Sequence, residues 1–528
     1  MLALLLYLPG FFTLPPTDRD EARFAEASRQ MLQSGNLDDI RFQDQPRYQK
    51  PIGIYWLQSA AAFLAGRPAD AIWPYRIPSL IGAILTLYFL LRLGERLFDR
   101  RSGLIAAVLL GSCILLSVEA RIATTDACLL AASLAAFEAF AAAYLGPINR
   151  MLAMQFWIAL GASILLKGPV LALILAITIV TLVIADRRIA WLKRLQPLLG
   201  VPLAALIVAP WLIAIAFASH GAFYQASLGK DFFSKITSAQ ELHGFPPGFY
   251  LAALAVTFWP SGLIAVAALP AAWQRRKLPV YRFLLAWLIP AWIVMEAVPT
   301  KLVHYVLPLY PALALMAASI FADRSLPLTA IWRHWLGKAA IVLWLIVGGA
   351  GVAILSLGGR RMTGSIEPID LLAGIVLAAS IAGALWLLLL DQREAALGMF
   401  VVVSLVLQTG LFGMLLPRLD SLWLSRQAEK LVASASPCSQ PLVVSSGYEE
   451  PSLVFLLGQQ TSLMGPEDAA HTLLDRRGKS CTLALVAAED DQRFRDSLGG
   501  VAPQSLGQIE GINYNLGRRQ QLSLYALP

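Results

Sequence analysis

The stretch WLGKAAIVLWLIVGGAGVAILSL, residues 335–357, decides the class of this protein because it has the length and apolarity of a membrane-spanning helix. A helix needs roughly 20 apolar residues to cross hydrocarbon about 30 Å thick. The whole chain of 528 residues is 57% hydrophobic and 14% charged, whereas soluble domains average roughly 45–50% and about 25%. The sequence therefore predicts a polytopic α-helical membrane protein.

Thirteen apolar stretches can be drawn, several of them shorter than a full span, so we expect at least ten spans with approximate bounds. They are residues 1–14, 79–98, 103–118, 128–146, 151–166, 169–185, 198–217, 248–271, 280–298, 302–321, 335–357, 370–390 and 396–416. The first has no basic leader and is followed by Pro15 and Pro16, unlike a signal peptide. We interpret it as a first span whose start is missing, a hypothesis that N-terminal sequencing would test.

Basic residues lie in alternate loops, which predicts the orientation in the membrane. If the loop 15–78 faces outward, the cytoplasmic loops hold Arg96, Arg100, Arg101, Arg187, Arg188, Lys193, Arg194, Arg275, Arg276, Lys277, Arg324, Arg333 and Arg393, as the positive-inside rule requires. The net charge of +8 thus reflects topology. The sequence contains no basic stripe with interleaved aromatic residues, so it does not indicate nucleic acid as a partner.

The outward side receives most of the unusual polar residues. It holds the loop 15–78, the turn Glu119–Asp126, Lys167, the loop 218–247, Lys301 and the chain after about Arg418. A single polar group at the end of a span is ordinarily a solvated anchor, but here carboxylates and cations converge on one side. This convergence predicts an active site that faces outward.

The chain changes character at about residue 418, where a membrane domain (1–417) gives way to a more polar tail (418–528). Apolar runs such as 442–444 and 482–486 alternate with helix-like segments, which predicts a small α/β domain. On the outward side Cys438 and Cys481 would meet an oxidising compartment, and we expect them to pair. Cys113 and Cys128 lie at the ends of apolar stretches and are expected to be small buried residues.

The segment TDRDEARFAE, residues 17–26, predicts a short amphipathic helix directly after the first apolar stretch. Asp20 and Arg23 would be neighbours at i, i+3 near its N-terminus, where the helix dipole favours an ionised carboxylate. Such a carboxylate suits a catalyst that accepts a proton or steadies a developing positive sugar carbon. A solvated helix start is the alternative, and the spacing alone favours that alternative.

The segment PRYQKP, residues 46–51, precedes the aromatic stretch IGIYWL, residues 52–57, which is too short to span and suits the membrane interface. This arrangement could cradle a lipid phosphate. Arg23, Lys50 and Lys301 would supply positive charge to a phosphodiester leaving group. Contact with lipid headgroups is the alternative for each cation.

With these motifs in place, the chain resembles a known family. Residues 17–58, TDRDEARFAEASRQMLQSGNLDDIRFQDQPRYQKPIGIYWLQ, are similar to the first periplasmic loop of bacterial aminoarabinose transferases and their protein mannosyltransferase relatives, which are GT-C membrane glycosyltransferases. Further matches follow in order: ARIATTDACLL (120–130), LLKGPV (165–170), HGFPPGFYL (243–251), KLVHYVLPLYPALALM (301–316) and GYEEPSLVFLLG (447–458). The resemblance covers nearly the whole chain.

The resemblance implies a GT-C fold of about thirteen transmembrane helices with a small periplasmic α/β C-terminal domain, in a bacterial inner membrane. It places the family's acidic positions on Asp20, Glu21 and Asp126, as catalytic candidates, with Asp20 foremost. The family's carrier-binding positions fall on Arg23, Tyr48, Lys50, Lys301 and Tyr305. His243 matches a family histidine and is a candidate ligand for a divalent metal. Gln49 stands where close relatives commonly have Glu, which removes a potential ligand and puts metal binding in doubt.

The function that the resemblance implies is inverting transfer of a sugar from a polyprenyl (undecaprenyl) phosphate carrier to a periplasmic acceptor, with lipid A as the leading candidate and membrane lipids as surroundings. A protein O-mannosyltransferase-like reaction on a protein or another envelope glycan is the alternative. A transporter of lipid-linked sugars is the non-enzyme alternative, but mid-span charge is scarce, with Glu138 the clearest case, and no inverted repeat is evident. An assembly protein with a membrane anchor would need only one or two spans.

Overall fold

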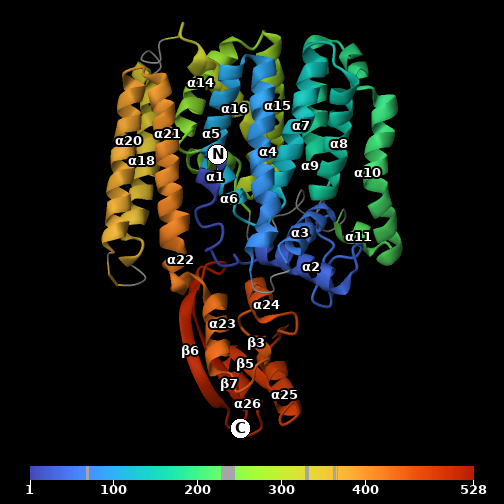
Figure 1. Cartoon of the computed structure of the whole chain (residues 1–528), viewed down its shortest axis with the longest axis vertical. Helices are drawn as coiled ribbons and strands as arrows, with labels where there is room; N and C mark the ends of the chain where they lie inside the picture. Colours follow the sequence, from blue (N-terminus) through green and yellow to red (C-terminus); the bar gives the residue numbers. More distant parts are fainter. Residues whose placement is uncertain (67–70, 228–243, 327–331, 361–363, 366) are drawn as a thin grey trace.

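The computed structural model places a helical bundle at one end of the molecule and a small α/β domain at the other, with helices α2 (Asp20–Ser34) and α3 (Gly53–Leu64) between them (Figure 1). It describes residues 1–66, 71–227, 244–326, 332–360, 364–365 and 367–528. Within these ranges nine helices are long and apolar enough to cross a membrane. They are α4 (Trp73–Leu97), α7 (Asp126–Leu145), α8 (Arg150–Lys167), α10 (Pro197–Ala218), α15 (Pro279–Ala297), η3 with α16 (Val303–Ala322), α18 (Trp335–Leu357), α20 (Pro368–Leu389) and the run of α21, η4 and α22 (Arg393–Arg418).

The other predicted spans are shorter or interrupted helices. The stretch 1–14 contains the helix α1 (Leu2–Tyr7), the stretch 103–118 divides into α5 (Arg100–Gly111) and α6 (Ile114–Glu119), and 248–271 divides into α13 (Phe249–Thr257) and α14 (Gly262–Gln274). The stretch 169–185 forms α9 (Val170–Asp186). Apolar composition therefore predicted where helices lie but not where they break.

Two of these breaks complete each other's hydrogen bonds. The amide of Ile114, at the start of α6, donates to the carbonyl of Trp259 between α13 and α14 at 3.1 Å. Ser261 donates its hydroxyl to the carbonyl of Leu109 at 2.6 Å and lies 3.1 Å from the Ser112 hydroxyl. Non-helical backbone inside a membrane bundle is tolerated only where protein groups satisfy it. The two interrupted helices therefore stabilise one another.

Two glycines bring the helices around the candidate site close together. A Cβ atom on Gly82 of α4 would lie 2.8 Å from the backbone of Ala127 in α7, and one on Gly53 of α3 would lie 2.7 Å from the carbonyl oxygen of Leu165 in α8. Those distances are well inside van der Waals contact. Only glycine lets α4 approach α7 and α3 approach α8 this closely. These two contacts position the ends of α7 and α8 that carry Asp126 and Lys167.

Glu138, the mid-span carboxylate that the sequence singled out, is fully buried in α7 and neutralised within the bundle. Arg92 of α4 donates from Nε to its Oε1 at 2.9 Å, and Arg96 lies 3.4 Å from the same oxygen. Gln155 of α8 donates to Oε2 at 3.1 Å. A charge inside a membrane is stable when it is paired in this way. The residue therefore ties three helices together.

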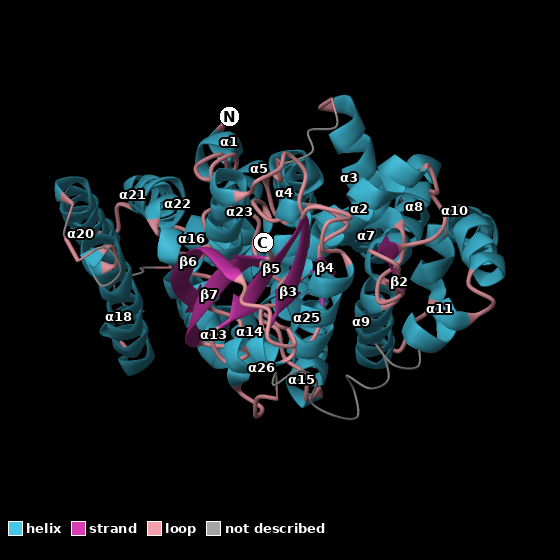
Figure 2. Ribbon diagram, turned by 90° about the horizontal axis from the view of Figure 1, so that it is seen from below, coloured by secondary structure: helices cyan, strands magenta, loops and turns pink. Residues whose placement is uncertain are grey.

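The C-terminal α/β domain is built on a five-stranded sheet of order β4-β3-β5-β7-β6. Its elements are α23 (Leu424–Ala435), β3 (Leu442–Ser446), α24 (Pro451–Leu457), β4 (Ser462–Leu463), α25 (Pro466–Asp475), β5 (Thr482–Ala487), α26 (Asp491–Asp496), β6 (Gln504–Asn513) and β7 (Arg518–Ala526). The strands β4, β3 and β5 are parallel, and β7 and β6 are antiparallel. Figure 2 shows these strands beneath the middle of the bundle, between α18 and α20 on one side and α8 and α10 on the other.

The cysteine predictions are confirmed. Cys438 and Cys481 form a disulfide that joins the segments leading into β3 and β5, the two central parallel strands of the sheet. Cys113 and Cys128 are free and buried. A covalent link between sequence-distant segments limits the unfolded state and stabilises a small domain of this kind.

Candidate active site

Asp20 is the first residue of α2 and the most exposed of the predicted carboxylates, with a side chain that is 58% exposed. Its Oδ1 lies 3.9 Å from a terminal nitrogen of Arg47, which is buried. The residue before it, Arg19, has φ of 63°, a left-handed conformation that is unfavourable for a residue with a side chain. The predicted helix start is confirmed, and the turn at Arg19 presents Asp20 at the edge of the site.

The C-terminal domain contacts the chain just before this turn. The Asp18 amide donates to the Tyr514 hydroxyl at 2.7 Å, and the Ser452 hydroxyl donates to the Asp18 carboxylate. Burial raises the pKa of Asp18 to about 7, and the neighbouring charge of Glu450 acts in the same direction. Farther along α2, Arg29 donates to the carbonyl of Phe455 at 2.8 Å. The α/β domain therefore holds the helix that carries Asp20.

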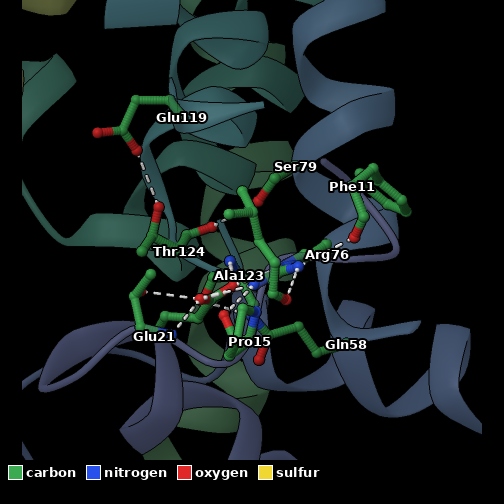
Figure 3. A network of polar contacts seen from close by, with 11 residues as sticks. Phe11, Pro15, Glu21, Gln58, Arg76, Ser79, Glu119, Ala123 and Thr124 are labelled. Atoms are coloured by element: carbon green, nitrogen blue, oxygen red, sulfur yellow. Dashed lines mark hydrogen bonds and ion pairs between the residues drawn. The ribbon is translucent and has the colours of Figure 1, made fainter. Parts of the chain in front are cut away.

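Glu21, the neighbour of Asp20, has a different place from the one we predicted. Its side chain is 1% exposed and pairs with the fully buried Arg76 of α4, with Nε 2.7 Å from Oε1 (Figure 3). The same two oxygens accept hydrogen bonds from the Thr17 amide and hydroxyl and from the Ala123 amide. Arg76 also donates to the carbonyls of Phe11, Leu14 and Pro15. Because its oxygens are occupied and buried, the geometry of Glu21 favours a positioning role over the predicted catalytic role.

A second polar cluster forms where α6, α7, α8 and η3 (Val303–Leu309) meet. Lys167, the last residue of α8, pairs with Asp126, the first residue of α7. The His304 ring lies between two carboxylates, with Nδ1 3.8 Å from Glu119 and Nε2 4.0 Å from Asp126. Lys167 Nζ lies 5.4 Å from the centre of the Tyr305 ring. We refer to Glu119, Asp126, Lys167, His304 and Tyr305 as the inner cluster.

Asp20 and Lys50 act electrostatically on the inner cluster. Burial raises the pKa of Glu119, and the negative charge of Asp126 raises it further, while the Thr124 hydrogen bond and Lys167 oppose this. The charge of Asp20 also reaches Glu119, and the charges of Asp20 and Lys50 reach the His304 ring. The first loop and the span ends thus surround one site, although their residues are far apart in sequence.

An apolar groove of about 1010 Å³ runs along the helices that carry Asp126 and Lys167 at their ends. Helices α3, α4, α7 and α8 line it, with Leu57, Ala61, Ile81, Ala131, Ile158 and Leu166 among the residues at its wall. Its lining includes Cys128, two residues after Asp126, and Leu166, which directly precedes Lys167. The groove has the composition of a site for a hydrocarbon chain.

The structure separates the predicted carrier-binding residues into a half-buried group and a buried group. Arg23, Lys50 and Tyr305 are half-buried and lie on the elements that surround the site. Tyr48 is largely buried and donates its hydroxyl to Asp39 at 2.9 Å, and burial together with this bond raises its pKa to about 12.

Lys301 is 2% exposed and donates to the carbonyls of Phe245 and Val298 at 2.9 and 2.7 Å. Main-chain oxygens thus already hold its ammonium group, an arrangement that does not favour the predicted contact between Lys301 and the carrier phosphate. His243, the predicted metal ligand, lies outside the described residues.

Comparison with known proteins supports the predicted resemblance. A family model described as dolichyl-phosphate-mannose-protein mannosyltransferase matches residues 49–213, which contain the groove and the Asp126–Lys167 pair. An undecaprenyl phosphate-alpha-4-amino-4-deoxy-L-arabinose arabinosyl transferase from Aeromonas salmonicida is 29% identical over 345 residues, or 61% of this chain and 60% of that protein. Its counterpart from Pectobacterium atrosepticum is 26% identical over 371 residues, or 68% of this chain and 64% of that protein. Each alignment thus spans less than two thirds of the relative.

The similarity of fold extends over the whole chain. The crystal structure of ArnT from Cupriavidus metallidurans bound to undecaprenyl phosphate matches with a TM-score of 0.76 and 18% identity, covering 99% of this chain and 96% of that one. The chain has the GT-C fold of this neighbour, and its sequence is similar to those of the aminoarabinose transferases. An oligosaccharyltransferase from Archaeoglobus fulgidus has the same general fold, with a TM-score of 0.53, 13% identity and coverage of 92% and 68%. The predicted GT-C fold class is confirmed.

Four residues of this site were not assigned a role from the sequence: Arg47, Glu119, Lys167 and His304. Lys167 and Glu119 were recognised only as outward-facing polar groups. His304 lies inside the motif KLVHYVLPLY, between Lys301 and Tyr305, and was passed over in favour of its neighbours. An imidazole in an otherwise apolar helix-forming segment was the available signal, because such a group needs a polar partner.

Glu119, Asp126 and His304 could also hold a metal ion. One donor atom from each lies within 4.8 Å of the others. Two carboxylate oxygens and one imidazole nitrogen form a donor set that Zn²⁺ accepts. Lys167 already pairs with Asp126, so a cation bound there would have to share this carboxylate with the ammonium group. The residues fit a metal, and its charge would add to that of Lys167.

Proposed function

We propose that this protein is a glycosyltransferase that moves a sugar from a polyprenyl phosphate carrier to an acceptor at the membrane surface facing its C-terminal domain, with lipid A as the acceptor. The observation that carries the proposal is the apolar groove along α3, α4, α7 and α8, together with the Asp126–Lys167 pair at the ends of α7 and α8 and the exposed Asp20. A carrier of this kind combines a hydrocarbon tail, a phosphate and a sugar, and the groove, the cations and the open edge correspond to these three parts.

The cations are suited to the leaving group. Lys167 and the half-buried Lys50 both act electrostatically on Asp126. Their positive charges would stabilise the phosphate as its bond to the sugar breaks. The name of the Cupriavidus structure states that its chain binds undecaprenyl phosphate, and the names of the curated relatives describe the same carrier. Both support a polyprenyl phosphate as the donor.

The two carboxylates have different surroundings and therefore different roles. Asp126 is 6% exposed and paired with Lys167, so it holds the cation in place. Asp20 is exposed, and its nearest described cation is 3.9 Å away, so it can contact an incoming acceptor. We assign the acceptor-facing role to Asp20 and the orienting role to Asp126.

The reaction is an inverting displacement. An oxygen of the acceptor attacks the anomeric carbon of the sugar, the bond between that carbon and the carrier phosphate oxygen breaks, and polyprenyl phosphate leaves with the bonding electrons. If the acceptor is a hydroxyl, its proton passes to Asp20. If the acceptor is a lipid A phosphate, it is already an anion, and Asp20 orients the incoming group or steadies positive charge on the sugar.

The arginines and the disulfide support the orientation that we propose. Basic loops gather at the end of the bundle away from the α/β domain, which is the cytoplasmic side under the positive-inside rule. The Cys438–Cys481 disulfide suits an oxidising compartment. We therefore place the candidate site and the α/β domain in the periplasm of a bacterial inner membrane.

The central experiment replaces Asp20 by asparagine and Asp44 by asparagine as a matched control, because Asp44 is an exposed carboxylate of the same loop. Transfer from a polyprenyl-phosphate-linked aminoarabinose to lipid A is measured with purified protein. Asp20→Asn is expected to lose about a hundredfold or more in rate with unchanged folding, and Asp44→Asn to keep its rate. Lys50→Ala is expected to raise KM for the carrier more than it lowers kcat. Full activity of Asp20→Asn would refute the assignment.

A second candidate function is transfer to a protein, which the mannosyltransferase description of the matching family model favours. Lipid A mass spectra from a deletion strain and its complemented strain separate the two. A missing aminopentose mass in the deletion strain supports lipid A as the acceptor. Unchanged lipid A together with a lost protein glycan would favour protein transfer, and loss of neither would return the transporter as the leading function.

A further inference from the structure

A second pocket lies at the opposite end of the bundle from the candidate active site. It has a volume of about 600 Å³ and is formed where α7 and α9 end, η1 (Ala190–Leu195) follows, and α15 begins. Asp126 and Tyr144 lie at opposite ends of α7, so the two sites are separated by about 27 Å at 1.5 Å per residue. Nothing in the proposed transfer reaction uses this pocket.

The pocket carries an excess of positive charge. Three of its lining residues are arginines, Arg188, Arg194 and Arg282, and one is a carboxylate, Asp186. Asp186 is already satisfied, since Arg282 pairs with it and the Tyr144 hydroxyl donates to it at 2.6 Å. Three positive charges against one negative charge leave two that are uncompensated.

Arg188 and Arg194 supply these two charges. Both are exposed. One guanidinium nitrogen of Arg194 donates a hydrogen bond to the carbonyl of Ala143 at 2.9 Å. In the chain as far as it is described, the Arg188 guanidinium makes no hydrogen bond or ion pair. Guanidinium groups with free donors on a shared pocket favour an anion with several oxygen atoms, above all a phosphate.

Aromatic and aliphatic side chains lie beside the charged residues of the pocket. The Trp191 ring forms part of the wall, is 7% exposed, stacks on Phe140 at 5.3 Å and meets the edge of Tyr144 at 5.5 Å. Ile184 and Ile189, beside the pocket, are 72% and 62% exposed. Exposed isoleucines near the end of an apolar helix such as α9 are stable against lipid and unfavourable in water. A ligand here therefore has a phosphate and an apolar chain next to it.

We propose that this pocket binds the phosphate of an anionic phospholipid in the membrane leaflet opposite the candidate active site. Arg188 and Arg194 contact the phosphate oxygens, Arg282 is held in place by Asp186 and Tyr144, and the acyl chains lie along Ile184 and Ile189. Basic pockets between helices at this depth recognise lipid headgroups through the same combination of charge and apolar surface. The inference does not depend on the transfer reaction.

The test uses the purified full chain, stripped of bound lipid, and compares the double variant Arg188→Ala/Arg194→Ala with Arg187→Ala/Lys193→Ala. The control residues are exposed neighbours that do not line the pocket. Each double variant removes two positive charges, so the two variants differ only in whether those charges line the pocket. Phosphatidylglycerol, phosphatidylethanolamine and inorganic phosphate are titrated separately, and bound molecules are counted by native mass spectrometry. Size-exclusion profiles and circular dichroism check the fold.

The unaltered chain and the control variant are expected to bind phosphatidylglycerol about tenfold or more tightly than the pocket variant, since two phosphate contacts are lost in the latter. Phosphatidylethanolamine should bind weakly to all three. Equal binding of phosphatidylglycerol by the two variants would overturn the proposal. Inorganic phosphate that binds as tightly as the lipid would also overturn it, because the acyl chains would then contribute nothing. The exposed, unpaired Arg188 permits the single variant Arg188→Ala to decide the matter if the double variant folds poorly.

Discussion

Replacing Glu21 by glutamine is expected to destabilise the fold strongly, although the two side chains have nearly the same shape. Both carboxylate oxygens accept from several donors: Oε1 from Arg76 and the Ala123 amide, and Oε2 from Arg76 and the Thr17 amide and hydroxyl. Whichever way the glutamine amide turns, its NH₂ group meets at least two donors. It also leaves the fully buried Arg76 without its counter-charge.

Breaking a buried ion pair by removing one partner costs about 3–5 kcal/mol, and this value applies here because the side chains are 0% and 1% exposed. Asp20→Asn, one residue earlier, removes an exposed charge with a distant partner and should change stability by about 0.5 kcal/mol or less. The two variants therefore separate a positioning role from a catalytic one. Glu21→Gln should lose stability, and Asp20→Asn should lose activity.

The assay is denaturant unfolding of the purified protein in detergent, followed by circular dichroism, for Glu21→Gln, Arg76→Met and the double variant. The double variant should lose less than the sum of the single variants, since each single change leaves an unpaired partner. A Glu21→Gln protein that unfolds within about 1 kcal/mol of the unaltered protein would show that the pair is not the buried support described above.

Three further predictions concern the domain contact, the disulfide and the inner cluster. Burial raises the pKa values of Asp18 and Glu26 to about 7, so the folded state keeps protons that the unfolded chain has already released. The free energy of unfolding should therefore fall as pH rises from about 4 to about 7. Thermal unfolding of Asp18→Asn should show a weaker dependence on pH. An unchanged slope would exclude Asp18 as a source. Cys438→Ser is expected to cost about 2–4 kcal/mol, measured by unfolding with and without reductant, and a reductant that leaves the unaltered protein as stable as before would contradict this. Lys167→Met should tighten Zn²⁺ binding in calorimetry, because Asp126 no longer neutralises an ammonium group; equal or weaker binding would argue against the metal site at Glu119, Asp126 and His304.

The membrane class, the positions of most spans, the helix starting at Asp20 and the cysteine pairing all followed from the sequence. The membrane class and the spans depend on local composition, and the helix start depends on the residues of its own first turn. The cysteine pairing depends on the oxidising compartment that the predicted topology implies. The breaks in 103–118 and 248–271 did not follow, since the Ile114 amide is satisfied by the carbonyl of Trp259 on another helix. A pattern of apolar residues carries no information about such a partner.

Adjacent residues show most clearly what only tertiary structure decided. Asp20 and Glu21 carry the same charge in the same motif, but successive residues of a helix point in directions about 100° apart, so one remains at the surface while the other meets Arg76, far along the chain. In the same way the sequence favoured Lys301 over Lys167 as a cation for the carrier phosphate, whereas the folded chain places carbonyl oxygens around Lys301 and Asp126 beside Lys167. Sequence determined which charges reach the outer side of the membrane, because hydrocarbon sorts residues by polarity alone. Tertiary structure decided which of them stay available for chemistry, because that depends on partners contributed by other helices.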